Sequence, residues 1–444
     1  MPSAVLNMFQ RLFRQWDSLH PYNGGQAMLL AGPPDVPRTA AAWHQTLHDL
    51  DLGRVRLRGD RVIHEAQFPD TDPHDLLEHA PASPGVHLPG AHLTAALNRP
   101  YNAREDKPFR AFLVEEAGNH WLGVAYQHWV ADSASVRALM REWYLRLYAP
   151  ELARRRPAAL APQQQVVHEA LCVLEDAVGG VLGSVRAVSR MKRVRRLDVP
   201  ATAPLDVAFM RLPTPPDLLP RLQAAARRLG VTVNDLFVAA AGWSAVQTVP
   251  LKRTASRRNL AVGTIVDLRP RATPTDAADA FGLQLGFFRT AYTPRQARDA
   301  RSLLLATTGQ MRLLKQHRHD RSGLLTLATG LAAGKLFDGP ELVEFYRKRV
   351  PLAAGVSNVN LDRTSWPGAW PGTWPAEAAT DRGGRVLDYL RASPTGPVMP
   401  VVFTPTTFAG RLNVGMTWRR AVLDEPAAGR TGRIFIETLE YLCQ

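Results

Sequence analysis

The chain has 444 residues, of which 45% are hydrophobic and 21% are charged. These proportions are typical of a globular protein with a sizeable core and exclude wholesale disorder. Lys and Arg number 54 against 40 Asp and Glu, which gives a formal net charge of +14. Such a surface favours an acidic protein, an anionic membrane face or a nucleic acid as partner. Because the sequence has no zinc knuckle, RNA-recognition signature or interleaved aromatic and basic residues, we expect no nucleic-acid partner.

Disulfides, metal sites and membrane helices are not expected. The two cysteines, Cys172 and Cys443, are too few for a disulfide framework or an all-cysteine metal site, and we predict no metal site of another kind. The longest uncharged run, 392–410, contains four prolines, which argue against a membrane helix. The first 20 residues lack the apolar core of a signal peptide. We expect a cytoplasmic, monomeric protein whose basic face can approach an anionic membrane.

In the first third of the chain, helices and strands alternate. Apolar spacing predicts a helix from Ala40 to Leu50, and short strands follow from Arg54 to Glu65. The stretch from Phe68 to Pro89, rich in Pro, Asp and His, reads as a loop. Two strands are expected at Phe109 to Glu115 and Asn119 to Tyr126, and then a helix from Ser135 to Tyr148 with one apolar face.

The segment 151–204 is expected to connect two domains, 1–150 and 205–444. It begins rich in Arg, Ala and Pro and ends in a basic run from Arg186 to Arg196. That run is either a solvated face or a docking surface for an acidic carrier protein or anionic lipid.

The second half mixes helices and strands again, which predicts a two-domain α/β (α+β) protein. We expect strands at Val207 to Leu212, Leu260 to Val266 and Gln284 to Ala291, helices at Leu218 to Leu229 and Asn234 to Val246, two strands between Val398 and Leu423 with a turn at Gly410, and a final helix from Gly429 to Leu442.

The most informative segment is WLGVAYQHWVADSAS, Trp121 to Ser135. An apolar strand runs into His128, and Asp132 follows four residues later, before the amphipathic helix. A histidine at the end of a strand is held on a rigid element, and its ordinary pKa near 6.5 suits proton transfer at neutral pH. On this pattern alone, a purely structural role for His128 stays open.

This segment resembles the HHxxxDG motif of the chloramphenicol-acetyltransferase-like superfamily. That group includes condensation domains of nonribosomal peptide synthetases, polyketide-associated acyltransferases and bacterial wax ester synthases. The preceding NRPYN (98–102) and PFRAFLV (108–114) are similar to the lead-in of that motif. Further resemblances follow in the family's order: TVNDLFVAA from Thr232, VDLR from Val266, the strand from Gly282 to Arg289, and VSNV from Val356.

The resemblance implies two similar lobes, each a mixed sheet flanked by helices, with the active site between them. The matching residues imply that His128 is the general base and that Asp132 is mainly architectural. As that base, His128 would take a proton from a hydroxyl or amine acceptor, which attacks an acyl thioester. The thioester is carried by coenzyme A or by the phosphopantetheine arm of a carrier protein, and no bound cofactor is needed.

Other site residues are less firmly indicated. Asp132 is expected to pair with Arg289 or Arg269. Ser357 and Asn358 either donate to the oxyanion or cap a turn.

The chain departs from the motif at two positions. Gln127 stands where the family has its first histidine, and Ser133 stands where it has glycine. We expect Gln127 and Ser133, like Ser357 and Asn358, to lie among the substrate-binding residues. We expect the Ser133 hydroxyl either to cap the following helix or to contact substrate. The two departures also support a rival hypothesis, a catalytically silent relative that acts as a binding or docking module.

Overall fold

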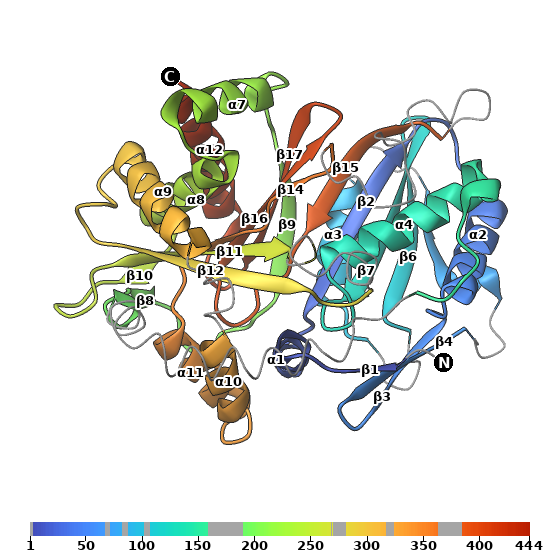
Figure 1. Ribbon diagram of the computed structural model, residues 1–444, viewed down its shortest axis with the longest axis horizontal. Coiled ribbons are helices and arrows are strands. Elements are labelled where there is room, and N and C mark those ends of the chain that lie inside the picture. The colour runs from blue at the N-terminus through green and yellow to red at the C-terminus, as the bar shows by residue number, and fades with distance from the viewer. Residues whose placement is uncertain are drawn as a thin grey trace.

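The computed structural model describes residues 3–66, 72–81, 88–101, 107–158, 190–267, 269, 281–316, 324–362 and 384–444. Two mixed sheets form the cores of two lobes that lie side by side (Figure 1). The predicted two-lobed α/β architecture is therefore confirmed. Residues 159–189, which include Arg186 and most of the predicted connection, lie outside the described ranges. The domain boundaries at 150 and 204 stay predictions.

The first lobe is built on a five-stranded sheet in the order β15–β2–β7–β6–β5. Its strands are β15 (Val386–Ala392), β2 (Asn23–Leu30), β7 (Asn119–Gln127), β6 (Phe109–Glu116) and β5 (Leu77–Ala80). The β6–β7 hairpin agrees with the two predicted strands. The prediction of a loop from Phe68 to Pro89 was wrong in part, because β5 pairs in parallel with β6. That pairing depends on a partner more than 30 residues away, which local composition does not report.

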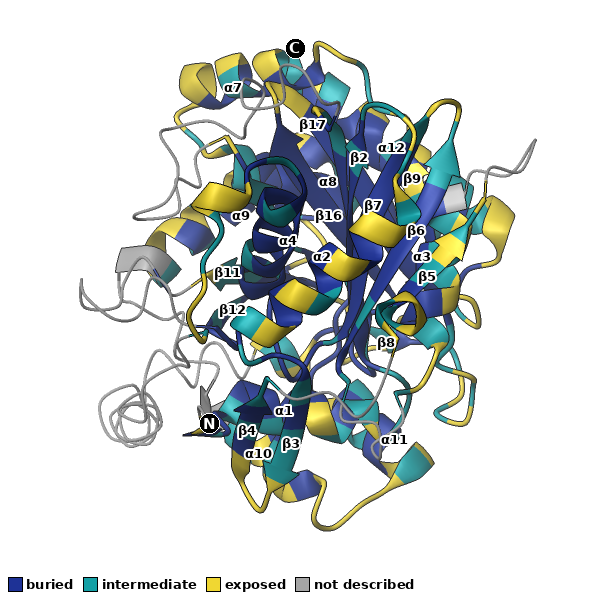
Figure 2. Cartoon of the chain, turned by 90° about the vertical axis from the view of Figure 1, so that its right-hand side faces the viewer, coloured by how far each residue is buried: buried dark blue, intermediate teal, exposed yellow. Residues whose placement is uncertain are grey.

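Helices cover both faces of this sheet, because side chains alternate along each strand. Leu122 and Val124 of β7 belong to the cluster that also holds residues of α2 (Val36–Asp49) and α4 (Ser133–Tyr148). Trp121, on the opposite face, packs with Leu93 and Leu97 of α3 (Leu88–Asn98). Figure 2 shows the strands buried, while α2 exposes its outer face to solvent.

One strand of the five-stranded sheet comes from the second half of the chain. β15 pairs antiparallel with β2 and forms the edge of the sheet nearest the second lobe (Figure 1). The chain continues from β15 into β16 of the second lobe. Residues near the end of β15 can therefore contact both lobes.

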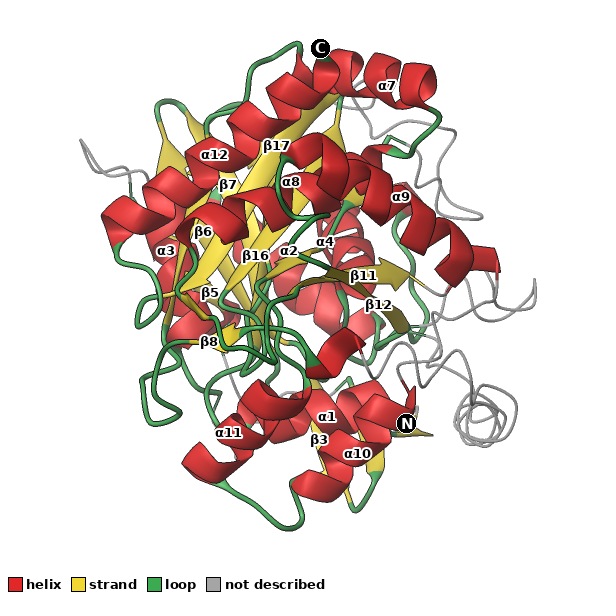
Figure 3. Ribbon diagram, turned by 90° about the vertical axis from the view of Figure 1, so that its left-hand side faces the viewer, coloured by secondary structure: helices red, strands yellow, loops and turns green. Residues whose placement is uncertain are grey.

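The second lobe contains a seven-stranded sheet in the order β12–β11–β13–β16–β17–β9, with β14 paired beside β16. Its strands are β12 (Leu285–Tyr292), β11 (Leu260–Asp267), β13 (Ala354–Val356), β16 (Val401–Phe408), β17 (Arg411–Arg419), β9 (Val207–Leu212) and β14 (Val359–Asn360). Its covering helices are α7 (Leu218–Leu229), α8 (Val233–Thr248), α9 (Ala300–Gln316) and α12 (Glu425–Cys443) (Figure 3).

The helix α8 lies at the centre of the second lobe because it is apolar on nearly every side. Thr232 is its N-cap and forms a capping box with Asp235. No single helix among the described residues is long and apolar enough to cross a membrane, although α7 and α8 together reach the required length with a bend of 103°.

Several smaller elements complete the structure. They are β1 (Ser3–Val5), β3 (Arg54–Arg58), β4 (Arg61–Glu65), α1 (Met8–Asp17), α10 (Leu324–Ala333), α11 (Gly339–Arg349), the short pair β8 (Arg196–Leu197) and β10 (Leu251–Lys252), and 3-10 turns at Pro73–Leu76 and Pro150–Leu152. From α1, Gln15 donates to the carbonyl of Gly330 in α10. The N-terminal helix thus joins the two halves of the chain.

Candidate active site between the lobes

His128 is the first residue after β7, where the buried strand turns towards α4. Its amide donates to the carbonyl of Tyr22 at 3.0 Å, which fixes the backbone at this point. The imidazole is buried among three rings, with centroid distances of 5.0 Å to Phe13, 5.7 Å to Tyr22 and 5.5 Å to Tyr126. The ring of His128 is thus held by packing, as positioning of a catalytic group requires.

The hydrogen bond of His128 assigns the tautomer of its ring. Nδ1 lies 3.2 Å from the carbonyl oxygen of Ala131, which can only accept a hydrogen bond. Nδ1 therefore bears the proton, and Nε2 has the free lone pair. Burial lowers the pKa of His128 below its ordinary value. The imidazole is therefore neutral at neutral pH, the state in which it can accept a proton.

Asp132 is buried at the start of α4 and has two local tasks. It is the N-cap of α4, and its Oδ1 accepts from the amides of Ala134 at 3.1 Å and Ser135 at 2.9 Å. It also pairs with Arg269, whose Nη1 and Nη2 lie 2.7 Å from Oδ2 and 3.0 Å from Oδ1. Burial alone would raise the pKa of Asp132, but Arg269 and the amide hydrogen bonds lower it below its ordinary value.

The ion pair also ties the two lobes together. The amide of Gln284, just before β12, donates to Asp132 Oδ2 at 2.9 Å, and the amide of Asp132 donates to Gly282. Gly282 has a φ of 135°, a conformation that favours glycine. Arg289, the other candidate partner, is on β12, where it pairs with Gly263 of β11. Burial lowers the pKa of Arg289 to about 10. Arg269 is the arginine that contacts Asp132.

Ser133 does not cap the helix, because Asp132 holds the N-cap position. The Ser133 hydroxyl instead accepts from Arg137 Nη1 and from Arg391 Nε, each at 3.0 Å. Sequence reasoning missed both arginines. Their signal was a charge within an apolar pattern, Arg137 on α4 and Arg391 on β15.

The remaining predicted residues surround this centre. Gln127 donates from Nε2 to Asp17 Oδ2 at 3.4 Å, so the residue in the first histidine position contacts the end of α1. The backbone amide of Ser357 already donates a hydrogen bond to the carbonyl of Phe403. The hydroxyl of Ser357 accepts from Arg391 at 2.9 Å and keeps its own proton for donation. Asn358 is half-buried in the same link between β13 and β14.

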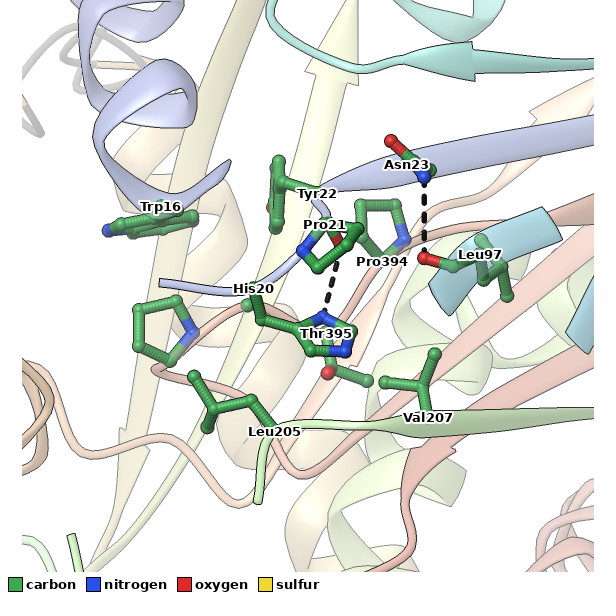
Figure 4. A pocket seen from close by; sticks show the side chains of 12 residues that line it. Trp16, His20, Pro21, Tyr22, Asn23, Leu97, Leu205, Val207, Pro394 and Thr395 are labelled. Atoms are coloured by element: carbon green, nitrogen blue, oxygen red, sulfur yellow. Dashed lines mark hydrogen bonds between the residues drawn. The ribbon is translucent and has the colours of Figure 1, made fainter. Parts of the chain in front are cut away.

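A narrow cavity is lined in part by Tyr22 (Figure 4). Its lining includes Trp16, His20, Tyr22 and Leu97 from the first half and Leu205 from the second. With about 10 Å³ of free volume it has room for little more than one water molecule. Tyr22 contacts both this cavity and the ring of His128. His128 does not line the cavity itself.

A larger groove, of about 660 Å³, lies between α3 and β9. Its lining comes from both halves of the chain and includes Thr94, Asn98, Phe209 and Trp418. Neither His128 nor Asp132 lines this groove. Within the described ranges, no three His, Cys, Asp or Glu side chains are grouped so that they could hold a metal ion.

The described part of the basic run belongs to a wider basic surface. β8 pairs with β10, and Val194 bridges to Asn259, so a second basic segment lies beside the first. The basic surface consists of Arg190, Lys192, Arg193, Arg195, Arg196, Lys252, Arg253, Arg257 and Arg258. Burial and the neighbouring Arg253 lower the pKa of Arg195, which shows that like charges face one another here. The sequence predicted only the first of the two segments.

Comparisons with known proteins bear on the fold of the chain. No family model and no curated protein matches the chain. Among solved structures, the condensation domain of the Monacolin K polyketide synthase MokA aligns with a TM-score of 0.65 at 12% identity, over 100% of this chain and 97% of that one. The first condensation domain of the calcium-dependent antibiotic synthetase, in complex with a substrate analogue, aligns with a TM-score of 0.63 at 17% identity over 100% and 97%.

A third neighbour is the X-domain from teicoplanin biosynthesis in complex with OxyB. It aligns with a TM-score of 0.59 at 15% identity, over 99% of this chain and 93% of that one. At these identities the likeness concerns the fold. The chain therefore has the two-lobed fold of the condensation domains among these neighbours.

Proposed function

We propose that the protein is an acyltransferase that moves an acyl group from a thioester to a hydroxyl or amine, with His128 as general base. The observation that supports this most is the state of the His128 ring. Its Nδ1–H donates to the Ala131 carbonyl, and its pKa is lowered, so Nε2 is free to take a proton. General-base catalysis by a positioned histidine typically contributes about 10²–10⁴-fold.

In this mechanism Nε2 removes the proton from the acceptor as its oxygen or nitrogen attacks the thioester carbonyl. The tetrahedral oxyanion that forms can accept a hydrogen bond from the Ser357 hydroxyl, which donates to none of the described residues. Collapse of the intermediate releases the thiolate, and the proton on Nε2 can be returned to it. Asp132 and Arg269 stay outside the chemistry and hold the His128 loop and α4 against the second lobe.

The co-substrate that we propose is acyl-CoA or an acyl group on the phosphopantetheine arm of a carrier protein. The basic surface fits an acidic carrier protein, because complementary charges attract and orient two partners as they associate. A cytoplasmic location is consistent with both donors and stays a prediction, as does the monomeric state.

The test is a panel of acyl-CoA and carrier-bound donors offered with alcohol and amine acceptors, with products read by mass spectrometry. The proposal expects a product from the wild type that His128→Ala does not form. If wild type forms no product with either class of donor, or if His128→Ala turns over within about threefold of wild type, the proposal is contradicted.

A second candidate function is a silent docking module. It is favoured by the tight packing around His128 and by the Ser133 hydroxyl, which fills the glycine position and is held by two arginines. The X-domain neighbour was solved with a protein partner, OxyB. A docking module would bind an acidic protein through the basic surface with the same affinity whether or not His128 is intact.

A further inference from the structure

Two buried arginines meet at the hydroxyl of Ser133. Arg137, on the second turn of α4, is 9% exposed, and Arg391, near the end of β15, is 2% exposed. Arg137 Nη1 and Arg391 Nε each lie 3.0 Å from Ser133 Oγ. Because both donate to one oxygen, two like charges are close neighbours inside the protein.

Among the described residues no carboxylate pairs directly with either arginine, although Asp267 and Asp132 attract Arg137 from farther away. Within the described ranges, neither guanidinium lies within 4.0 Å of an Asp or Glu oxygen. The Arg391 guanidinium also donates to the carbonyl and the hydroxyl of Ser357, at 3.0 and 2.9 Å. Asp132 is nearby, but Arg269 and three amides already occupy it. Since buried charges are normally paired with an opposite charge, an anion is missing here.

Burial of an arginine is not by itself unusual in this fold. Arg419 is 5% exposed and donates through Nε and Nη2 to the carbonyl of Gly396. It is, however, a single cation with a backbone partner. The pair at Ser133 differs because two cations converge on one neutral hydroxyl, which can compensate neither charge.

The arginine pair is held rigidly beside the candidate base. Gln26 Nε2 donates to the carbonyl of Ser133 at 3.0 Å, and Tyr389 donates to Gln26 Oε1 at 2.7 Å. Through Ser357, Arg391 also reaches the second lobe. The charge of Arg391 is one of the influences that lower the pKa of His128, so the pair lies within electrostatic range of that ring.

We propose that Arg137 and Arg391, together with the hydroxyl of Ser133, bind a carboxylate carried by one of the two substrates. A guanidinium presents parallel N–H donors that match a carboxylate, and the carboxylate would replace the Ser133 hydroxyl as the shared acceptor. The phosphate of a pantetheine arm lies the length of the arm from the thioester, so the anion beside His128 belongs to the acyl group or the acceptor. The inference rests on the proposed function for the identity of the ligand as a substrate.

The test is direct binding of three carboxylates, acetate, propionate and benzoate, to the full chain, measured by isothermal titration calorimetry. Benzamide, of the same shape as benzoate but uncharged, and inorganic phosphate are the comparison ligands. At least one carboxylate should bind wild type, and Arg137→Met and Arg391→Met should each weaken it by about 10- to 100-fold. The matched variant Arg419→Met should leave that affinity unchanged.

Several outcomes would overturn the proposal. These are no binding of any carboxylate, benzamide binding as tightly as benzoate, equal affinity in Arg137→Met and wild type, or tighter binding of phosphate than of every carboxylate. Circular dichroism checks the folding of each variant. If Arg391→Met does not fold, the variants of the less buried Arg137 test the proposal. Arg137→Lys is then expected to bind the carboxylate more tightly than Arg137→Met.

Binding and turnover separate this inference from the proposed function. A protein that binds a carboxylate through the arginine pair but forms no product would contradict the acyltransferase proposal and leave the anion site standing. A protein that forms product through His128 but binds no carboxylate would contradict the anion site and leave the acyltransferase proposal standing.

Discussion

Asp132 and Arg269 form a two-point ion pair, with N–O distances of 2.7 and 3.0 Å, between the start of α4 and the segment that follows β11. Both side chains are almost completely buried. Because Asp132 also caps α4 and accepts from the amide of Gln284, one carboxylate connects the loop of His128 to the second lobe. The pair thus acts on the candidate base through the position of its loop.

Removing one member of this ion pair should destabilise the protein strongly. Asp132→Ala removes the two-point partner and helix cap and leaves the buried Arg269 only the half-exposed Asp267, at 3.2 Å, for which a loss of about 3–5 kcal/mol in the free energy of unfolding is expected. The control is Asp424→Ala, which removes the exposed N-cap of α12 and should cost only about 0.5–2 kcal/mol. Urea unfolding measures both. Equal costs would mean that Asp132 is no more than a helix cap.

Ser133→Ala should also be destabilising, although Ser133 is half-exposed. It removes the oxygen to which Arg137 and Arg391 both donate, and leaving buried donors unsatisfied costs about 1–3 kcal/mol. If Ser133 only capped α4, the loss of stability in Ser133→Ala would be smaller. Ser18→Ala, at an exposed hydroxyl, should change stability by no more than about 0.5 kcal/mol. If the Ser133→Ala and Ser18→Ala proteins unfold at the same temperature, the hydroxyl of Ser133 does not support the arginine pair.

The rate of transfer should stay high in mildly acidic solution. Burial lowers the pKa of His128, so the ring loses its proton at a lower pH than an exposed histidine does. His128 is neutral and active above its pKa, and it becomes protonated and inactive as the pH falls below that pKa. The acid limb of kcat/KM should therefore have its midpoint below about 6.5, the ordinary pKa of histidine. A midpoint above this value would contradict a buried neutral base.

Charge reversal on the basic surface should weaken docking of an acidic carrier protein. Lys192→Glu combined with Arg193→Glu changes the charge by four units, and the loss of affinity should be larger at low ionic strength, where screening is weaker. The matched control reverses Arg227 and Arg228, two exposed arginines on α7. Affinity measured by surface plasmon resonance that falls equally in both variants would show only a general charge effect.

Local sequence patterns predicted the elements that carry their own signal. The β6–β7 hairpin, α4, α7, α8, β9 and α12 appeared where periodicity and turn residues placed them, because each buries one face or has a defined end. The elements β2, α3 and β15 were missed. β2 contains two glycines in sequence, Gly24 and Gly25, which make it a weak strand former. Its position depends on pairing with β7 and β15, segments far apart in the chain.

The candidate site was predictable only where the sequence concentrates it. His128 and Asp132 lie within one short segment, so their spacing was visible. The sequence left Asp132 with two candidate partners, and the choice of Arg269 over Arg289 follows from tertiary structure. Arg391 could not have been placed beside Ser133, because the return of β15 to the first sheet leaves no local trace.

The central claim is that Nε2 of His128 takes the proton from the acceptor, and single-turnover kinetics test it most directly. His128→Gln should be compared with His120→Gln, a substitution at another buried histidine associated with β7, whose Nδ1 lies 2.7 Å from the carbonyl of Gly32. The account predicts that acyl transfer slows by about 10²–10⁴-fold in His128→Gln and by no more than about threefold in His120→Gln. Equal rates in the two variants, with both proteins folded, would contradict it.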